Sequence, residues 1–229
     1  MTAPGPNCEP QARAMRAAAE VALRFVEPGS LVGVGTGRTA AAFIEALAGS
    51  DRQPRAAVAS SVRSMELLQA AGIEVVPLWG AGLLPLYVDG ADVVDPELRL
   101  LKGGGGAHGG EKLVAGASTF FICIVDDSKL ADTLQGHPVP VEVVPAFRDQ
   151  ALAALAELGG TPVTRDGFLT DRGNEVFDVT GLDLTDPLAM ELRLEQLPGV
   201  VACGIFALRG ADVLLVGHPD GSVEERSRF

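Results

Sequence analysis

The chain has 229 residues, 47% of them hydrophobic, which is enough to bury one large core or two unequal ones. Its formal net charge of −12 argues against a polyanionic partner such as nucleic acid or an acidic membrane surface. A small phosphorylated metabolite stays compatible with this charge, because a local cluster of donors can outweigh a distant net charge.

The isolated cysteines indicate a reducing compartment. Cys8, Cys123 and Cys203 are isolated and form no CxxC pattern, so we expect neither a disulfide framework nor a structural zinc site. No apolar run reaches the length of a membrane span, and the N-terminus lacks a basic-then-apolar signal pattern. We therefore expect a cytoplasmic protein that needs no membrane, metal or cofactor.

Short apolar strands alternate with helices along the first half of the chain. Such alternation predicts βαβ units and a mostly parallel, Rossmann-like sheet. The predicted elements are a helix over 11–26, a strand over 30–34, a helix over 40–47, a strand over 58–60, a helix over 64–71, strands over 74–77 and 86–89, a helix over 111–117 and a strand over 120–125.

The pattern changes after residue 136. A strand, a helix, a hairpin, a second helix and a further strand follow one another, which predicts a small α+β domain of the ferredoxin type. The elements are predicted over 139–144, 148–158, 167–179 with its turn at 172–174, 187–197 and 200–208, and a strand over 211–217 returns the chain to the first sheet. The fold class is therefore α/β, with residues 1–136 and 209–229 as the Rossmann-like catalytic domain and 137–208 as the smaller inserted domain.

The segment VGVGTGRTAAAF reads as a strand, a glycine-rich turn and the start of a helix. Such a turn presents backbone N–H groups at the positive end of a helix dipole, which suits a phosphate. A dinucleotide motif is only half present, because Gly33 and Gly35 fit but Arg38 occupies the third glycine position. A purely structural turn is the alternative, and we expect phosphate binding.

Asp89 and Asp92 follow a predicted strand, so they stand at its carboxyl end, where open α/β sheets bind ligands. Two acids three residues apart could bind magnesium or form a turn. With no third acid or histidine clustered nearby, hydrogen bonding to sugar hydroxyls is the better interpretation.

All three lysines of the chain, Lys102, Lys112 and Lys129, lie within one segment, whereas arginine is used fifteen times elsewhere. Arginine cannot imitate a compact ammonium beside a reacting centre. Lys102 precedes four glycines, so a charge is followed by exposed amides, the ingredients of an oxyanion site. Glu111, at the start of a predicted helix, supplies a carboxylate base. Together these parts suit proton transfer next to a sugar carbonyl.

The motifs GVGTGRT, YVDGAD, LLKGGGG, EKLVA, DDSK, PVPVEVVP, TDRGN and PGVV occur in one collinear order from residue 11 onward. In its motifs and in their order, the chain resembles the type A ribose-5-phosphate isomerases. Enzymes of that family interconvert ribose 5-phosphate and ribulose 5-phosphate without a metal. The resemblance implies Glu111 as the base that moves a proton between C1 and C2. It also implies Lys102 and the Gly103 amide region as the oxyanion stabilisers, and Asp89 and Asp92 as hydroxyl-binding acids that assist ring opening.

The resemblance further implies a shell of substrate-binding residues and a homodimer or homotetramer. This shell comprises Thr36, Gly37, Arg38, Thr39, Gly90, Ala91, Gly103, Gly104, Gly105 and Lys129.

The chain departs from the family pattern at several positions around the proton-transfer residues. Arg38 replaces a serine, Val93 an acid, Met15 an N-terminal lysine, and Gly109-Gly110 a Thr-Arg pair. These changes leave open a paralogous isomerase with another sugar phosphate, for which Gly109-Gly110 would provide extra room near the reacting end. A non-catalytic sugar-phosphate sensor is the third alternative, although such a sensor would not need Lys102 and Glu111 together.

Overall fold

The computed structural model describes residues 8–228 and divides into two compact units. The first unit comprises Met1–Ala91, Val114–Lys129 and Ala211–Phe229, and the second comprises Asp92–Leu113 and Leu130–Gly210. The chain therefore passes between the units four times. One of these passages lies inside a helix, α4 (His108–Gly116).

The first unit is built on a six-stranded sheet with the order β13-β12-β6-β3-β1-β2. All neighbours pair in parallel except β12 and β13, which are antiparallel. The strands are β1 (Leu31–Val34), β2 (Ala56–Ala59), β3 (Leu84–Asp89), β6 (Ser118–Asp126), β12 (Val213–Gly217) and β13 (Val223–Ser227). The predicted Rossmann-like sheet is confirmed.

Two details of this sheet differ from the sequence prediction. Residues 74–77 form only an isolated bridge, Ala57 to Val75, rather than a strand. The edge strand β13 was missed because its sequence, VEERS, is mostly charged and lacks the apolar pattern of a buried strand.

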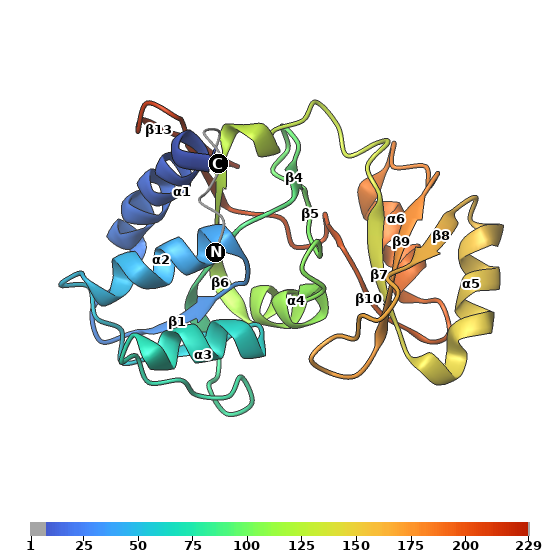
Figure 1. Ribbon diagram of the computed structural model, residues 1–229, viewed down its shortest axis with the longest axis horizontal. Coiled ribbons are helices and arrows are strands. Elements are labelled where there is room, and N and C mark those ends of the chain that lie inside the picture. Colours follow the sequence, from blue (N-terminus) through green and yellow to red (C-terminus); the bar gives the residue numbers. More distant parts are fainter. Residues whose placement is uncertain (1–7, 229) are drawn as a thin grey trace. The chain divides into compact units, whose positions relative to one another are not determined.

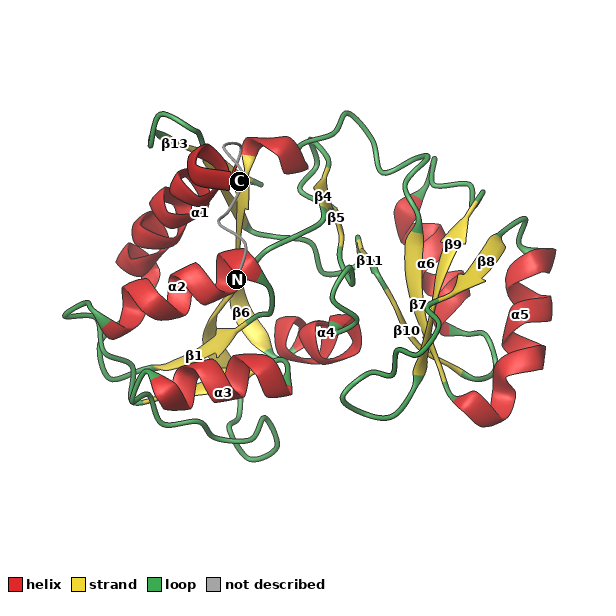
Figure 2. Ribbon diagram, viewed as in Figure 1, coloured by secondary structure: helices red, strands yellow, loops and turns green. Residues whose placement is uncertain are grey.

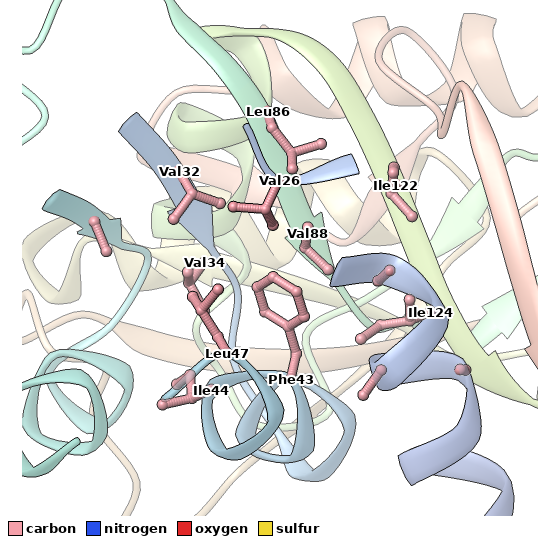
Figure 3. Packing of buried hydrophobic residues seen from close by; sticks show 14 of the residues in the cluster. Val26, Val32, Val34, Phe43, Ile44, Leu47, Leu86, Val88, Ile122 and Ile124 are labelled. Carbon is pink, nitrogen blue, oxygen red and sulfur yellow. The ribbon is translucent and has the colours of Figure 1, made fainter. Parts of the chain in front are cut away.

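Helices cover one face of this sheet and bury the main core. They are α1 (Cys8–Ala22), which continues as the 3-10 turn η1 (Leu23–Phe25), α2 (Arg38–Ala48) and α3 (Val62–Ala70). Figure 3 shows Phe43 and Leu47 of α2 packed against Val34, Val88 and Ile124 of the strands. Each such side chain contributes about 1.5–3 kcal/mol by leaving water.

The second unit contains the predicted ferredoxin-type arrangement (Figure 2). Its antiparallel sheet has the order β10-β7-β9-β8, and α5 and α6 both pack on one face of it. In chain order the elements are β7 (Val139–Val143), the 3-10 turn η3 (Pro145–Phe147), α5 (Arg148–Glu157), β8 (Thr161–Thr164), β9 (Glu175–Thr180), α6 (Pro187–Glu195) and β10 (Val200–Cys203). The small α+β fold is confirmed.

The hairpin predicted over 167–179 is displaced. Its first arm is β8 at Thr161–Thr164, and residues 165–174 form a long loop instead of a strand and a tight turn. The turn itself is present, because Gly173 N donates to Thr170 O at 2.8 Å.

A three-stranded sheet, β11-β5-β4, completes the second unit. Its strands are β4 (Val93–Val94), β5 (Leu100–Leu101) and β11 (Ile205–Phe206), each too short for a sequence pattern to reveal. The single strand predicted over 200–208 is divided into β10 and β11 at Gly204. A Cβ at Gly204 would lie 2.3 Å from Lys102 O, so only glycine allows this close approach of the two backbones.

The contacts group residues 92–113 with the second unit, whereas the sequence analysis assigned them to the first domain. The domain division at 136/137 and 208/209 stays a prediction. Among the helices of the described residues, none is both long and apolar enough to cross a membrane.

Candidate active site

The glycine-rich turn of the first unit connects β1 to α2 (Figure 1). Gly35 N donates to Val88 O at 2.9 Å, which holds the turn beside the end of β3. Gly37 has a φ of 109°, a left-handed conformation that favours glycine, and directly precedes α2. The first N–H groups of any helix lack an intrahelical acceptor, and at this helix start no side chain caps them.

Asp89, the last residue of β3, holds this turn in place. Its carboxylate is fully buried and accepts hydrogen bonds from Thr36 N at 3.0 Å, from Gly90 N at 2.7 Å and from the Tyr87 hydroxyl. A Cβ on Gly35 would lie 1.8 Å from Asp89 Oδ1, so the carboxylate fills the space that any other residue would need. The turn is therefore held in place by close packing and hydrogen bonds against Asp89.

A cluster of hydroxyl groups surrounds Thr36. Its Oγ1 lies 2.8 Å from the Oγ atoms of Ser60 and Ser61, and 3.2 Å from Ser64 Oγ. Ser61 caps α3 by accepting from Ser64 N at 3.1 Å. The sequence analysis did not include these serines in the site, although the pair directly after β2 and the N-cap pattern were readable signals.

The remaining predicted residues of the first unit follow the same two strand ends or the end of β6. A Cβ on Gly90 would lie 3.6 Å from Thr39 Cβ, so the two loops touch. Arg38 is exposed and lines a cavity of about 610 Å³ together with Met15 and Arg16 of α1. The half-buried Ala91 follows Gly90, and the half-buried Lys129 ends the 3-10 turn η2 (Asp127–Lys129).

In the second unit, the predicted base and ammonium lie side by side. Lys102 directly follows β5, and Glu111 lies in the first turn of α4. Lys102 Nζ is 3.2 Å from Glu111 Oε2, and their side chains are only 3% and 6% exposed. In a buried pair of opposite charges each group compensates the other's loss of hydration, so removing either partner leaves an uncompensated charge.

The glycine run after Lys102 is held in a fixed turn. Gly106 N donates to Gly103 O at 2.9 Å, and Gly103 has a φ of 102°. Asp92 Oδ2 accepts from Gly104 N at 2.7 Å, which joins the second predicted aspartate to the run. Gly105 is exposed, and a Cβ there would meet no atom within 4 Å.

Arg165 also holds this run, and the sequence analysis missed it. Its Nη1 donates to Gly103 O at 2.8 Å and to Gly104 O at 3.1 Å. Asp178 on β9 fixes the guanidinium with two hydrogen bonds of 2.7 and 2.6 Å. An isolated arginine in a loop carries no sequence signal for such a role, because the contact joins residues more than sixty positions apart.

His108, the first residue of α4, is fully buried beside the glycine run. A Cβ on Gly103 would lie 2.7 Å from His108 Nδ1. Burial, followed by the positive charges of Lys112 and Arg165, lowers the pKa of His108 to about 3. The imidazole is therefore neutral at pH 7, and no sequence motif singles His108 out.

The extra room expected at Gly109 is filled by a carboxylate. Glu142 on β7 is fully buried, and its Oε1 accepts from Thr170 Oγ1 and Asn174 Nδ2, both at 2.8 Å. A Cβ on Gly109 would lie 2.2 Å from Glu142 Oε2. The expectation of open space at Gly109 is therefore wrong, since the Glu142 side chain occupies the space that a Cβ would need.

The glycine-rich turn of the first unit and the Lys102–Glu111 pair of the second together indicate a class of protein. The first unit offers an uncapped helix start beside a buried acid, and the second a buried carboxylate paired with an ammonium. Such parts are typical of an enzyme that binds an anionic substrate and moves a proton next to a carbonyl. Within residues 8–228, no group of three or more His, Cys, Asp or Glu side chains could hold a metal ion.

Comparison with known proteins specifies the family. Residues 56–221 match the family model described as ribose 5-phosphate isomerase A (phosphoriboisomerase A). The ribose-5-phosphate isomerase A of Acidithiobacillus ferrooxidans is 49% identical over 210 residues, which cover 92% of this chain and 96% of that protein.

Solved structures agree with the sequence match. The ribose 5-phosphate isomerase A of Neisseria gonorrhoeae is 42% identical and superposes with a TM-score of 0.93, covering 96% of this chain and 98% of that one. The enzyme of Methanocaldococcus jannaschii is 34% identical, with a TM-score of 0.87 and coverages of 93% and 98%.

The chain therefore belongs to the ribose 5-phosphate isomerase A family. The predicted family, fold class and isomerase activity are confirmed by these matches. A paralogue with another substrate and a non-catalytic sensor are not favoured by them.

Proposed function

We propose that this chain interconverts D-ribose 5-phosphate and D-ribulose 5-phosphate through an enediolate. The observation that carries the mechanism is the buried contact of 3.2 Å between Lys102 Nζ and Glu111 Oε2. This contact provides a base and a positive charge in one environment that is shielded from water, where electrostatic stabilisation is strongest. The family to which the chain belongs supplies the substrate class.

Glu111 is the proposed base. Its carboxylate removes the C2 proton of the open-chain aldose, the C–H electron pair forms the C1–C2 double bond, and the carbonyl pair moves to O1. Lys102 stabilises the negative charge that develops on O1. Glu111 then returns its proton to C1, while the C2 hydroxyl proton moves to O1 and leaves the ketone at C2.

The glycine run is proposed to assist Lys102 through its amides. Gly104 N already donates to Asp92 Oδ2. The amides proposed to face the oxyanion are therefore those of Gly103 and Gly105, the second of which lies beside open space. Asp92 then has two proposed tasks, since it orders the run and binds a substrate hydroxyl.

The turn Thr36–Thr39 is proposed to bind the phosphate, because a helix start without a side-chain cap offers N–H donors to an anion. Asp89 is proposed to keep this turn in place, besides its predicted role toward a hydroxyl group during ring opening. Gly90, Ala91 and Lys129 stay proposed parts of the substrate shell.

A related D-ribose-5-phosphate isomerase has been solved in complex with phospho-erythronic acid; it is 34% identical to this chain, with a TM-score of 0.89. Phospho-erythronic acid carries an anionic group at each end, so it should also bind here and compete with ribose 5-phosphate. For this chain we further propose a cytoplasmic homodimer or homotetramer, as the family resemblance implies.

Proton NMR of ribose 5-phosphate with the purified protein in D₂O tests the proposal. We expect ribulose 5-phosphate to form and deuterium to enter at the carbon that receives the proton from Glu111. Conversion of other pentose or hexose phosphates, with ribose 5-phosphate left unchanged, would contradict the proposed substrate.

A further inference from the structure

Lys112 is a charged residue that the proposed reaction does not use, although it directly follows the base Glu111. Its ammonium contacts Glu191 Oε1 on α6, lies 3.0 Å from Glu195 Oε1, and donates to Ile205 O at 2.6 Å. The side chain is only 18% exposed. Lys112 therefore ties α4 to α6 and to β11 within the second unit.

Glu191 is itself fixed on both sides. Its side chain is 2% exposed, and its Oε2 accepts from the backbone N–H groups of Ala207 and Leu208, each at 2.7 Å. Burial lowers the pKa of Lys112, but the neighbouring Cys203 and Glu191 raise it above its ordinary value. The pair is thus a charged, buried anchor rather than a loose surface contact.

One aromatic ring connects this anchor to the proposed catalytic ammonium. Lys112 Nζ lies 4.4 Å from the centroid of the Phe206 ring, and Lys102 Nζ lies 5.6 Å from the same centroid. Both distances are within the range of a cation–π interaction. Phe206 pairs with Leu100 in the β11–β5 ladder, and Lys102 N donates to Gly204 O at 2.9 Å, so the ring's backbone is fixed beside that of Lys102.

We propose that Lys112, held by Glu191, is a positioning residue that orients Glu111 and Lys102 toward each other through α4 and the Phe206 ring. The inference rests on the proposed function. Neighbouring residues on a helix point about 100° apart, so fixing Lys112 on α6 sets the rotation of α4 that directs Glu111 at Lys102. The Phe206 ring, attracted by Lys112, limits in turn where Lys102 Nζ can lie.

The test is steady-state isomerisation of ribose 5-phosphate by Lys112→Met. We expect kcat to fall about 10- to 100-fold while KM changes less than about threefold, because a small misorientation of catalytic groups acts on the chemical step. The matched control is Arg148→Met. Arg148 also pairs with a carboxylate, Glu175 at 2.7 Å, and lies 5.3 Å from a phenylalanine ring, that of Phe177, but on α5. Its loss should leave kcat unchanged.

A second variant separates positioning from folding. Lys112→Met leaves Glu191 buried without its partner, which lowers stability. In Lys112→Met/Glu191→Gln the unpaired charge is gone, while a side-chain oxygen remains for the two backbone donors. We expect this double variant to recover the urea midpoint of unfolding but to keep the low kcat. Recovery of kcat together with stability would overturn the proposal.

Phe206→Leu supplies an independent route to the same step. It keeps an apolar side chain but removes the ring, and it should reduce kcat by less than Lys112→Met. When Phe206→Leu is combined with Lys112→Met, kcat should fall hardly further than in Lys112→Met alone, because both substitutions act through the same ring. Additive losses would contradict the shared ring. Inactive wild type would refute the proposed function, whereas active wild type with unimpaired Lys112→Met would refute only this inference.

Discussion

The glycine-rich turn of the first unit and the start of α4 in the second unit hold their side chains in different ways. Around Thr36 the contacts are hydroxyl groups and backbone amides, with Asp89 as the buried acid. Around α4 the buried contacts are mostly ionic, and include the pairs Lys102–Glu111 and Lys112–Glu191.

This difference agrees with the tasks proposed for the two regions, anion binding by the turn and proton transfer at the start of α4. An anionic group already carries its charge, so amides and hydroxyls that are fixed in advance can bind it. Proton transfer creates charge during the reaction, and that charge is best stabilised by ionised groups shielded from water. The second region therefore tolerates buried charges that would otherwise destabilise a fold.

Glu111→Gln should have the largest effect, because it removes the proposed base from the ionic region around α4. We expect kcat to fall about 10²- to 10⁴-fold with little change in KM, since the amide cannot accept the proton. Steady-state kinetics with ribose 5-phosphate measures this, and Glu157→Gln, an exposed residue at the end of α5, is the control. An unchanged kcat would remove Glu111 from the mechanism.

Gly35→Ala tests the rigidity of the neutral region. The new Cβ would lie 1.8 Å from Asp89 Oδ1, so the turn must shift away from the carboxylate. We expect kcat/KM to fall about 100-fold, as displacements of about 1 Å typically do. Gly49→Ala at the end of α2, where the nearest atoms would be 3.8 Å away, should leave kcat/KM near wild type. Equal losses in both variants would contradict the role of the turn.

His108 tests whether burial in the ionic region is costly at acid pH. Its folded-state pKa of about 3 lies below its ordinary value of 6.5. Between pH 3 and pH 6.5 the imidazole is therefore protonated in the unfolded chain but neutral in the folded chain. Stability should therefore fall as pH decreases through 6.5, by about 2 kcal/mol between pH 8 and pH 5. Urea unfolding of His108→Leu at both pH values should lack this contribution. An identical pH dependence in wild type and variant would show that His108 titrates normally.

Arg38→Ser should have the smallest effect, because Arg38 is an exposed charge beside an otherwise neutral turn. The family resemblance places Arg38 at a position that usually holds serine, and we expect Arg38 to take over the role of the N-terminal lysine whose position Met15 occupies. We expect KM to rise about fivefold with little change in kcat, which corresponds to about 1 kcal/mol of exposed charge pairing. Arg63→Ser on α3 is the control, and an unchanged KM would exclude Arg38 from phosphate binding.

Local patterns sufficed for the main elements and for the proposed chemical groups. The alternation of apolar strands and helices predicted both sheets, and the collinear motifs predicted the family. Lys102 and Glu111 were identifiable because the lysines were few and the glycine run followed directly. Weak patterns failed, as for the charged strand β13 and the two-residue strands of the small sheet.

The fold class and the family could be predicted from the amino-acid sequence, and so could the residues proposed for proton transfer, because each leaves a signal among neighbours in the chain. The side chains that surround these residues are visible only in the folded chain. Glu142 against Gly109, Arg165 on the glycine run and Glu191 on Lys112 are contacts across 33 to 79 positions of sequence. No local periodicity encodes such pairings, since they arise only when separate elements pack together and bury their charges.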